Sequence, residues 1–200
     1  MTIKYMIGMK TPLHGKNAVY KYYSVDDAVS QKDCDDFIAK YKGCLFDTSL
    51  VGLANNDSEN QNTLRKSKYF WIDANNLMAR VLWSYILEIN QHFQFNLSGY
   101  ENAQLAKYEK GDFYDWHKDT KEDNSGSERK LSATLQLSKP DDYKGCELQL
   151  FNGAEELEEL PVKNQGSIIV FRSDEWHRAT PITEGVRYSL VLWASGDKLK

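Results

Sequence analysis

Apolar residues recur at helical spacing in two stretches of the first half of the chain. In residues 26–43, which follow a short β-like run at 20–25, they share one face of the predicted helix: Cys34, Phe37, Ile38 and Tyr41. A longer helix is predicted over residues 74–93, where a broad apolar stripe is formed by Leu77, Val81, Leu82, Tyr85, Ile86 and Ile89. Because such stripes usually pack in a core, we assign both helices to structural support rather than to a cofactor site.

From about residue 100 the pattern changes to short runs separated by Gly, Pro, Asp and Asn. The runs are rich in apolar, β-branched and aromatic residues and cover 103–108, 131–137, 147–151, 166–171 and 186–193. Many short strands at this spacing are typical of a sandwich or barrel of the jelly-roll kind. We therefore expect a mainly β (α+β) fold whose β-rich second half is supported by the helices of the first half.

Two polar segments interrupt these patterns. The segment NNDSENQN at 55–62 contains no apolar residue and is predicted to be a surface loop. The segment TKEDNSGSERK at 120–130 is polar and contains Gly and Ser, which predicts a mobile lid. No repeat or linker divides the chain. We expect one domain over 1–200, with helical support at 1–99 and the β core at 100–195.

The composition narrows the class of protein. The chain has 200 residues, 41% of them hydrophobic and 27% charged, which is ordinary for a globular domain and excludes disordered and fibrous classes. The net charge of −4 provides no general attraction to phosphate backbones or anionic lipid. Nucleic acid and membranes are therefore not expected as partners, and a monomer is the favoured oligomeric state.

The cysteines and the N-terminal sequence favour a cytoplasmic location. The odd set of Cys34, Cys44 and Cys146 lacks CxxC spacing and predicts neither a disulfide framework nor a zinc knuckle. The first 16 residues lack the continuous apolar core of a signal peptide, and no later stretch has the length of a membrane span. We expect buried or inert thiols in a reducing compartment.

Three residues offer the donor set of a metal site. His117 and Asp119 stand at i and i+2, which places both side chains on one face of an extended strand. His177 directly follows a strand-like segment, so that a strand-rich fold can bring it to the same place. Two imidazoles and one carboxylate form the facial triad that binds Fe(II) and leaves coordination positions open. Without further support, an HxD pair is more often a surface ion pair, and His177 could simply cap a turn.

Arg187 favours the metal site over the surface ion pair. It lies ten positions after His177 in the run GVRYSLVLW, where an inward-pointing arginine would be an uncompensated buried charge unless an anion meets it. A dicarboxylic acid that chelates iron at one end would provide that anion at the other end. The combination of Arg187 with the HxD pair therefore favours an iron site with a dicarboxylate co-substrate.

The second half of the chain resembles a known family. The segments YEKGDFYDWHKD, LSATLQLSKPDDYKGCELQLF and GSIIVFRSDEWHRATPITEGVRYSLVLW are similar to the prolyl 4-hydroxylase-like branch of the Fe(II)/2-oxoglutarate dioxygenases, and more narrowly to the bacterial and phage PKHD-type hydroxylases. The resemblance covers about residues 100–195. It implies a double-stranded β-helix (jelly-roll) fold and a hydroxylase that uses Fe(II), 2-oxoglutarate and O2, with ascorbate as a possible supporting reductant.

The resemblance also implies roles for individual residues. His117, Asp119 and His177 are then the metal ligands, and Arg187 binds the distal carboxylate of 2-oxoglutarate, for which the guanidinium fork is the matching geometry. Two further co-substrate ligands, Tyr108 and Ser189, and the polar position Gln136 complete the implied site. Halogenases of the family replace the ligand carboxylate with a small residue, so Asp119 favours hydroxylation. Asp115 would share the ligand face and reach substrate or a histidine, whereas Trp116 and Trp176 should point away from the metal.

Several functions stay open at this stage. Peptidyl proline is the substrate that the family favours, while a free amino acid or another small molecule is the alternative. The same His/His/Asp set can bind zinc for hydrolysis, and a cupin-like binding module could use the same barrel. Arg187 argues against the hydrolase, because a hydrolase does not need a fixed carboxylate anchor. A nucleic-acid demethylase is disfavoured by the net charge and by the lack of a basic recognition segment.

Overall fold

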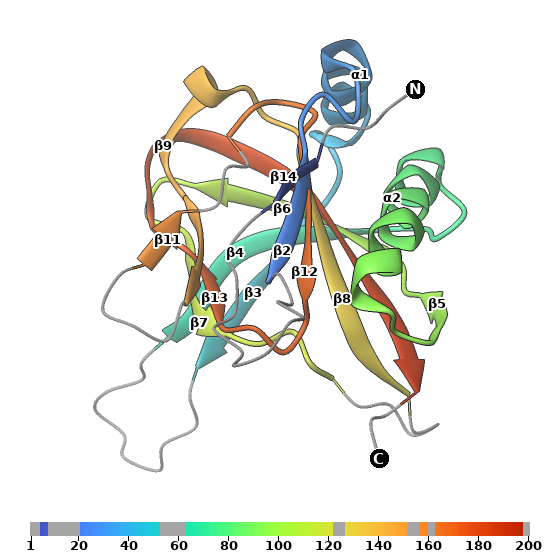
Figure 1. Ribbon diagram of the computed structural model, residues 1–200. Helices are drawn as coiled ribbons and strands as arrows, with labels where there is room; N and C mark the ends of the chain where they lie inside the picture. Colours follow the sequence, from blue (N-terminus) through green and yellow to red (C-terminus); the bar gives the residue numbers. More distant parts are fainter. Residues whose placement is uncertain are drawn as a thin grey trace.

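The computed structural model describes residues 5–7, 21–52, 63–121, 127–151, 157–159 and 163–197. Within them, fourteen strands form one curled antiparallel sheet whose main path runs β1-β2-β12-β8-β14-β6-β4-β7-β13-β10-β11, while β3 pairs with β4, and β5 and β9 pair with β14. Both helices lie on one side of the curled sheet, and the opposite wall contains β7, β13 and β11 (Figure 1). The predicted β-rich fold with supporting helices is confirmed.

The elements have the following bounds. The helices are α1 (Gln31–Tyr41) and α2 (Leu77–Phe93), and a short 3₁₀ turn, η1, covers Pro140–Asp142. The strands up to the HxD pair are β1 (Tyr5–Ile7), β2 (Tyr22–Val25), β3 (Asp47–Gly52), β4 (Thr63–Ile72), β5 (Leu97–Tyr100), β6 (Ala103–Glu109) and β7 (Phe113–His117). The later strands are β8 (Ser127–Gln136), β9 (Tyr143–Gly145), β10 (Leu148–Phe151), β11 (Leu157–Glu159), β12 (Ile168–Arg172), β13 (His177–Ala179) and β14 (Ile182–Asp197).

Side-chain caps set where each helix begins. The Ser30 hydroxyl accepts the backbone N–H of Asp33, so α1 starts at Gln31 and not at residue 26 as the apolar spacing predicted. The Asn76 side chain accepts the N–H of Met78 and starts α2 three residues after the predicted position. Apolar periodicity therefore located both helices, and capping chemistry determined their first residues.

Strand β14 contributes side chains to a cavity on one face of the sheet and to the hydrophobic core on the other. Its residues alternate between faces, so Arg187, Ser189, Val191 and Trp193 line a cavity inside the curl. The residues between them, including Leu190 and Leu192, pack toward the helices. Strands β6 and β8 alternate in the same way, with Gln104, Tyr108 and Thr134 on the cavity side. The sheet thus separates an apolar core from a polar interior.

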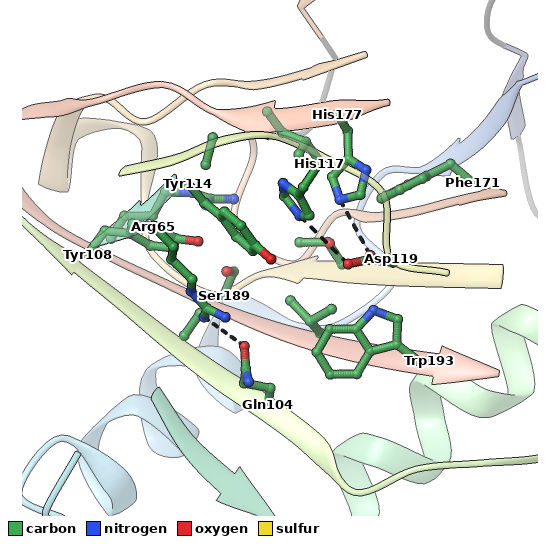
Figure 2. Close-up of a pocket in the computed structure, with 16 residues that line it drawn as sticks. Arg65, Gln104, Tyr108, Tyr114, His117, Asp119, Phe171, His177, Ser189 and Trp193 are labelled. Atoms are coloured by element: carbon green, nitrogen blue, oxygen red, sulfur yellow. Dashed lines mark hydrogen bonds and ion pairs between the residues drawn. The ribbon is translucent and has the colours of Figure 1, made fainter. Parts of the chain in front are cut away.

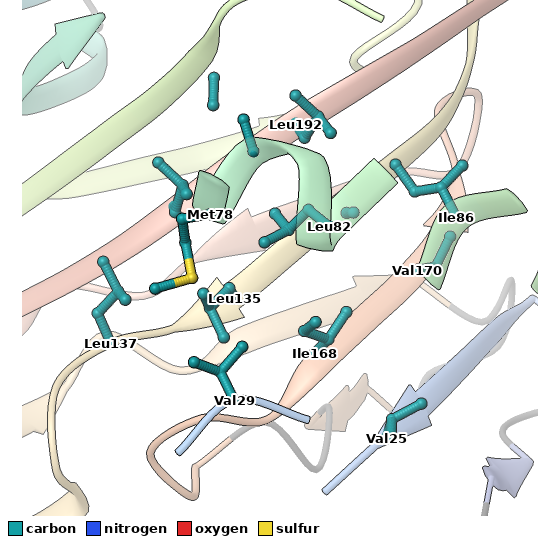
Figure 3. Packing of buried hydrophobic residues seen from close by; sticks show 14 of the residues in the cluster. Val25, Val29, Met78, Leu82, Ile86, Leu135, Leu137, Ile168, Val170 and Leu192 are labelled. Atoms are coloured by element: carbon teal, nitrogen blue, oxygen red, sulfur yellow. The ribbon is translucent and has the colours of Figure 1, made fainter. Parts of the chain in front are cut away.

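The main hydrophobic core lies between α2 and the sheet. Met78, Leu82 and Ile86 of α2 belong to one cluster with apolar residues of the neighbouring strands (Figure 3). The strand residues of this cluster include Leu135, Leu137, Ile168, Val170 and Leu192. Because the cluster holds the outer face of the sheet, it fixes the positions from which the polar side chains of the inner face project.

Strand β4 differs from the sequence-based expectation for the first half. We expected residues 1–99 to supply mainly helices, but Thr63–Ile72 pairs with β6 over Lys68–Ile72 and with β7 at Arg65 and Lys66. The strand was not predicted because Arg65, Lys66 and Lys68 make its first half polar, so that only the last four residues, YFWI, form a continuous apolar signal. On the inner face of the strand, Arg65 lines the cavity, so a charged residue stands where an apolar one is usual.

The expected lid is partly wrong. Ser127–Lys130 begins strand β8 and pairs with the end of β14, and Lys130 is buried. Residues 122–126 of that segment and the predicted loop at 55–62 lie outside the described residues. Of the helices that the structure describes, neither is long and apolar enough to cross a membrane.

Candidate metal and co-substrate site

Two neighbouring strands and one turn bring the HxD pair and His177 together. His117 ends β7, His177 begins β13, and the two residues are direct partners in the antiparallel register. Asp119 lies two residues beyond β7, where its backbone N–H donates to the carbonyl of Ser173 at 2.9 Å. One potential ligand atom from each of the three side chains lies within 4.8 Å of the others, and all three residues are buried (Figure 2).

Backbone carbonyls orient both imidazoles. His117 Nδ1 lies 2.7 Å from the carbonyl oxygen of Asp115, and His177 Nδ1 lies 3.0 Å from that of Glu175. A carbonyl oxygen only accepts, so each Nδ1 carries the proton and the lone pair of a neutral imidazole is on Nε2. Both Nε2 atoms face Asp119, at 3.6 Å from Oδ1 for His117 and 3.4 Å from Oδ2 for His177. This tautomer and orientation are what a histidine needs to bind a metal.

Electrostatics prepare the three side chains for a cation. Burial and the neighbouring His177 lower the pKa of His117 to about 3, so its imidazole is neutral at physiological pH. Burial alone would raise the pKa of Asp119, but His177 and His117 hold it well below its ordinary value. The Ser132 hydroxyl also donates to Asp119 Oδ2 at 2.8 Å. Against the effect of burial, Asp119 in turn raises the pKa of His177, which shows that the buried carboxylate favours a positive charge beside it. A divalent cation bound by the three side chains would supply that charge.

Arg187 is a buried cation in the same cavity. Only 3% of it is exposed, and no carboxylate pairs with it among the residues that the structure describes. Its Nε donates to the Gln136 side-chain oxygen at 3.0 Å, and its Nη1 lies 3.8 Å from Cys146 Sγ. Both neighbours are neutral partners, because burial raises the pKa of the Cys146 thiol. The guanidinium charge therefore stays available for an anion.

The segment DDYKGCEL, residues 141–148, lies beside Arg187 and contains Tyr143 and Cys146. The Gln136 amide donates to the Tyr143 hydroxyl at 3.1 Å and to the Ser138 carbonyl at 2.9 Å, which fixes its oxygen toward Arg187. Gly145 makes the close turn possible because its φ of +78° is unfavourable for other residues. A Cβ atom at this position would lie only 2.3 Å from a backbone oxygen. Gln136 therefore has a positioning role that the sequence alone did not reveal.

Tyr108 and Ser189 line the cavity beside Arg187. Tyr108 is the register partner of Arg187 across β6 and β14, and the Arg187 guanidinium lies 5.9 Å from its ring centroid. Burial raises the pKa of Tyr108 to about 12, so its phenol stays protonated and can donate a hydrogen bond. Ser189 is 2% exposed and shares the strand face of Arg187. Both side chains line the cavity beside Arg187, where each offers a hydroxyl donor.

Two residues of the cavity were missed by the sequence analysis. Arg65 of β4 and Tyr114 of β7 both line it, with the Arg65 guanidinium 4.6 Å from the Tyr114 ring centroid. The Tyr114 ring in turn stacks on His117, with centroids 3.4 Å apart and planes 7° apart. The signal that could have found Arg65 was the alternation of β4, in which Arg65, Ser67 and Tyr69 share one face.

Three residues beside the ligands lie outside the cavity. Trp116 and Trp176 do not line it, as their positions next to the histidines predicted, and Trp176 is 47% exposed. The Asp115 carboxylate is exposed and lies 3.9 Å from Arg178, in contrast to the expectation that it faces the ligands. Asp115 contributes its backbone carbonyl instead, as the acceptor of His117 Nδ1.

The donor set fits a divalent transition-metal ion. Two imidazole nitrogens with their lone pairs directed inward and one carboxylate form a facial set that leaves positions free for other ligands. The unpaired Arg187 fits a carboxylate in the same cavity. A curled antiparallel sheet that holds a His-Asp-His cluster and a free arginine in one cavity defines a jelly-roll protein suited to a metal and an acidic ligand.

Part of the chain is similar to a known family of sequences. Residues 103–195 match the 2OG-Fe(II) oxygenase superfamily. A PKHD-type hydroxylase of Synechococcus sp. (strain CC9902) is 42% identical over 91 residues, which cover 44% of this chain and 39% of that protein. Another, from Prochlorococcus marinus, is 28% identical over 175 residues, which cover 87% of this chain and 76% of that protein. The matches of higher identity thus span between 27% and 39% of the length of the curated relatives.

Solved structures share the fold at low sequence identity. A prolyl hydroxylase from Trichoplax adhaerens, in complex with a peptide fragment of a hypoxia inducible factor, has a TM-score of 0.66 at 19% identity and matches over 87% of this chain and 83% of that one. The viral collagen prolyl hydroxylase of Paramecium Bursaria Chlorella virus-1, in complex with 2-oxoglutarate, has a TM-score of 0.66 at 18% identity, over 88% and 96%. The predicted jelly-roll fold is confirmed, and residues 103–195 match the 2OG-Fe(II) oxygenase superfamily and are similar to PKHD-type hydroxylases.

Proposed function

We propose that the protein is an Fe(II)- and 2-oxoglutarate-dependent dioxygenase that hydroxylates an unactivated C–H bond, and that a peptidyl proline is its first candidate substrate. His117, Asp119 and His177 would hold the iron. Bound iron would supply the oxidation chemistry that this family couples to conversion of 2-oxoglutarate and O2 to succinate and CO2. Ascorbate would support activity as an external reductant.

The chain's own part is to bind and orient the co-substrate. Arg187 would pair with the distal carboxylate of 2-oxoglutarate, and Tyr108 and Ser189 would add hydroxyl donors to the same group. Gln136 would hold the guanidinium in place through its neutral oxygen. Strands β6, β8 and β14 keep these side chains in a buried cavity, which excludes water from the reacting groups.

One observation carries the proposal. Arg187 is a buried arginine without a carboxylate partner among the described residues, and it lines the same cavity as the His-Asp-His cluster. A buried, unpaired charge costs several kcal/mol in a folded protein unless a ligand compensates it. A zinc hydrolase or a cupin-like binding module has no need of this anchor, whereas a dicarboxylate that also binds the metal uses it directly.

The names of the relatives support the choice of substrate. The matched proteins are described as PKHD-type hydroxylases, and two structural neighbours as prolyl hydroxylases, one of them with a peptide bound. A free amino acid or another small molecule is the alternative substrate with the same chemistry. The reaction would take place in the cytoplasm.

Mass spectrometry would test the proposal. Proline-containing peptides and a cell lysate would be incubated with the protein, Fe(II), ascorbate and 2-oxoglutarate, and searched for a gain of one oxygen with formation of succinate. We expect both products to depend on O2 and to be absent with His177→Ala. A protein that binds neither metal nor 2-oxoglutarate would refute the proposal.

A further inference from the structure

Arg65 is a second buried arginine in the cavity. It is 8% exposed, and Figure 2 shows its side chain directed into the cavity between Tyr114 and Gln104. Its Nε donates to the Ser67 hydroxyl at 2.7 Å, and its Nη2 donates to the Gln104 side-chain oxygen at 2.9 Å. Both acceptors are uncharged, so they fix the guanidinium without neutralising it.

No carboxylate pairs with Arg65 within the part of the chain that the structure describes. Acidic side chains that do form ion pairs near this end of β4, such as Glu109 and Asp112, pair with lysines that project from its other face. An arginine that is more than nine-tenths buried without an anion is unfavourable in the free protein. Its place in the cavity is therefore best explained by a ligand that brings the negative charge.

The charges of the proposed co-substrate complex show that this ligand is not 2-oxoglutarate. The two positive charges of Fe(II) and the one of Arg187 equal the negative charges of Asp119 and of the 2-oxoglutarate dianion. Both carboxylates of the co-substrate are used in that arrangement, one at the metal and one at Arg187. Arg65 then remains as the one uncompensated cation among the described residues that line the cavity.

We propose that Arg65 binds a carboxylate of the primary substrate beside the metal, which makes an acidic group close to the reacting carbon the requirement for substrate recognition. The inference rests on the proposed function, because it assumes that 2-oxoglutarate occupies Arg187. The Tyr114 ring lies between the Arg65 guanidinium and His117. Its centroid is 4.6 Å from Arg65 Cζ and 3.4 Å from the centroid of the His117 ring. A carboxylate on Arg65 is thus held within a few bonds of the carbon that faces the metal.

This geometry refines the choice among proline-related substrates. A carboxylate at that position can come from a C-terminal prolyl residue, from an acidic residue next to an internal proline, or from a free amino acid. All three offer the planar anion that a guanidinium binds through two parallel hydrogen bonds. An internal proline with only neutral neighbours leaves Arg65 buried without a partner.

Fluorine NMR of trifluoroacetate tests the anion site without turnover. The protein would be loaded with Mn(II), which relaxes nearby fluorine nuclei, and saturated with 2-oxoglutarate so that Arg187 is occupied. We expect a saturable increase in the fluorine relaxation rate in the wild type and loss of at least four fifths of it in Arg65→Gln. Lys66→Gln is the matched control, because Lys66 is the next residue of β4 and its side chain is half exposed and paired with Asp112.

Calorimetry separates failure of this inference from failure of the proposed function. 2-Oxoglutarate should bind Mn(II)-loaded Arg65→Gln within threefold of its wild-type affinity, whereas Arg187→Gln should weaken it at least tenfold. If Arg65→Gln lowers the affinity for 2-oxoglutarate as much as Arg187→Gln does, Arg65 belongs to the co-substrate site and the inference is wrong. The inference is equally wrong if wild-type protein with 2-oxoglutarate bound shows no saturable trifluoroacetate signal. If the wild type binds no 2-oxoglutarate, the proposed function fails first.

Competition experiments then distinguish the sources of the carboxylate. The probes that displace trifluoroacetate would be L-proline, a tripeptide with a C-terminal proline, and an internal Pro-Glu peptide with blocked ends. Each has a carboxamide counterpart, with the carboxylate replaced, that should compete at least tenfold more weakly. Equal competition by each acid and its amide would contradict a carboxylate site at Arg65.

Discussion

Each of the two buried arginines in the cavity is held by a glutamine. Gln136 accepts from Arg187 at 3.0 Å, and Gln104 accepts from Arg65 at 2.9 Å. A carboxylate in either place would form a stronger contact but would also cancel the charge that a ligand needs. A side-chain amide orients the guanidinium and leaves its charge available, which is the property expected of a site prepared for anions.

Replacing Gln136 tests this positioning role. Gln136→Leu removes the acceptor of a buried N–H, a loss of about 1–3 kcal/mol, and lets the guanidinium turn away from its bound position. We expect 2-oxoglutarate affinity to fall roughly tenfold, since about 1.4 kcal/mol corresponds to a factor of ten, while Mn(II) affinity stays the same. Isothermal titration calorimetry measures both. Gln149→Leu, which removes the acceptor of Arg178 outside the cavity, is the control, and equal effects of the two variants would exclude a specific role.

The metal ligands are tested by truncation. His177→Ala and Asp119→Ala each remove one of three donors, so we expect a strong loss of Mn(II) and Fe(II) affinity and no succinate formation. The circular dichroism spectrum should stay that of a β-rich fold. Asp115→Ala is the control, because its side chain is exposed and its backbone carbonyl, which orients His117, is retained. Wild-type metal affinity in either ligand variant would show that the assignment is wrong.

At the scale of elements, the residues on the two faces of each strand explain what the sequence could and could not predict. Strand β14 was predicted because residues 186–193 combine apolar residues toward the helices with a few polar ones toward the cavity. Strand β4 was missed because its first half carries Arg65 and Ser67 on one face and Lys66 and Lys68 on the other. This half appears polar in sequence although the strand lies between β6 and β7 in the sheet.

The candidate site divides in the same way. His117, Asp119, His177 and Arg187 could be named from sequence because the two histidines, the carboxylate and the arginine form a specific combination, although the HxD spacing alone does not. The roles of Gln136 and Arg65 depend on register and on side-chain direction across strands, which spacing along one chain does not contain. The prediction of a mobile lid was wrong for residues 127–130. Polar residues such as Lys130 can belong to a strand, and here the strand is formed by pairing with β14.

The packing of α2 against the sheet is tested by one pair of leucines. Leu82 is fully buried in the core cluster, so Leu82→Ala should lower the free energy of unfolding by about 2–5 kcal/mol. Leu77, on the same helix, is 75% exposed, so Leu77→Ala should change stability by no more than about 0.5 kcal/mol. Urea denaturation of both variants measures the difference. Similar losses for the two would mean that α2 does not hold the outer face of the sheet.

For the whole molecule, the curled sheet separates an apolar core on its outer face from charged side chains on its inner face. Its outer face buries apolar residues against α2, and its inner face collects the histidines, the carboxylate and the two arginines in one cavity. The apolar core supplies the stability that tolerates buried charges without partners. In the free protein these charges are unfavourable, so binding of metal and 2-oxoglutarate should stabilise the fold.

The most direct test of this account is calorimetric titration of 2-oxoglutarate into the Mn(II)-loaded protein and its Arg187 variants. We expect binding to require the metal, so that EDTA abolishes it. Arg187→Ala should cost on the order of 2–5 kcal/mol because the buried anion loses its cation, which raises Kd by about thirtyfold or more. Arg187→Lys should recover only part of this loss, because a point charge does not reproduce the bidentate fork. Binding that is independent of the metal, or equally tight in wild type and Arg187→Ala, would contradict a 2-oxoglutarate site between His-Asp-His and Arg187.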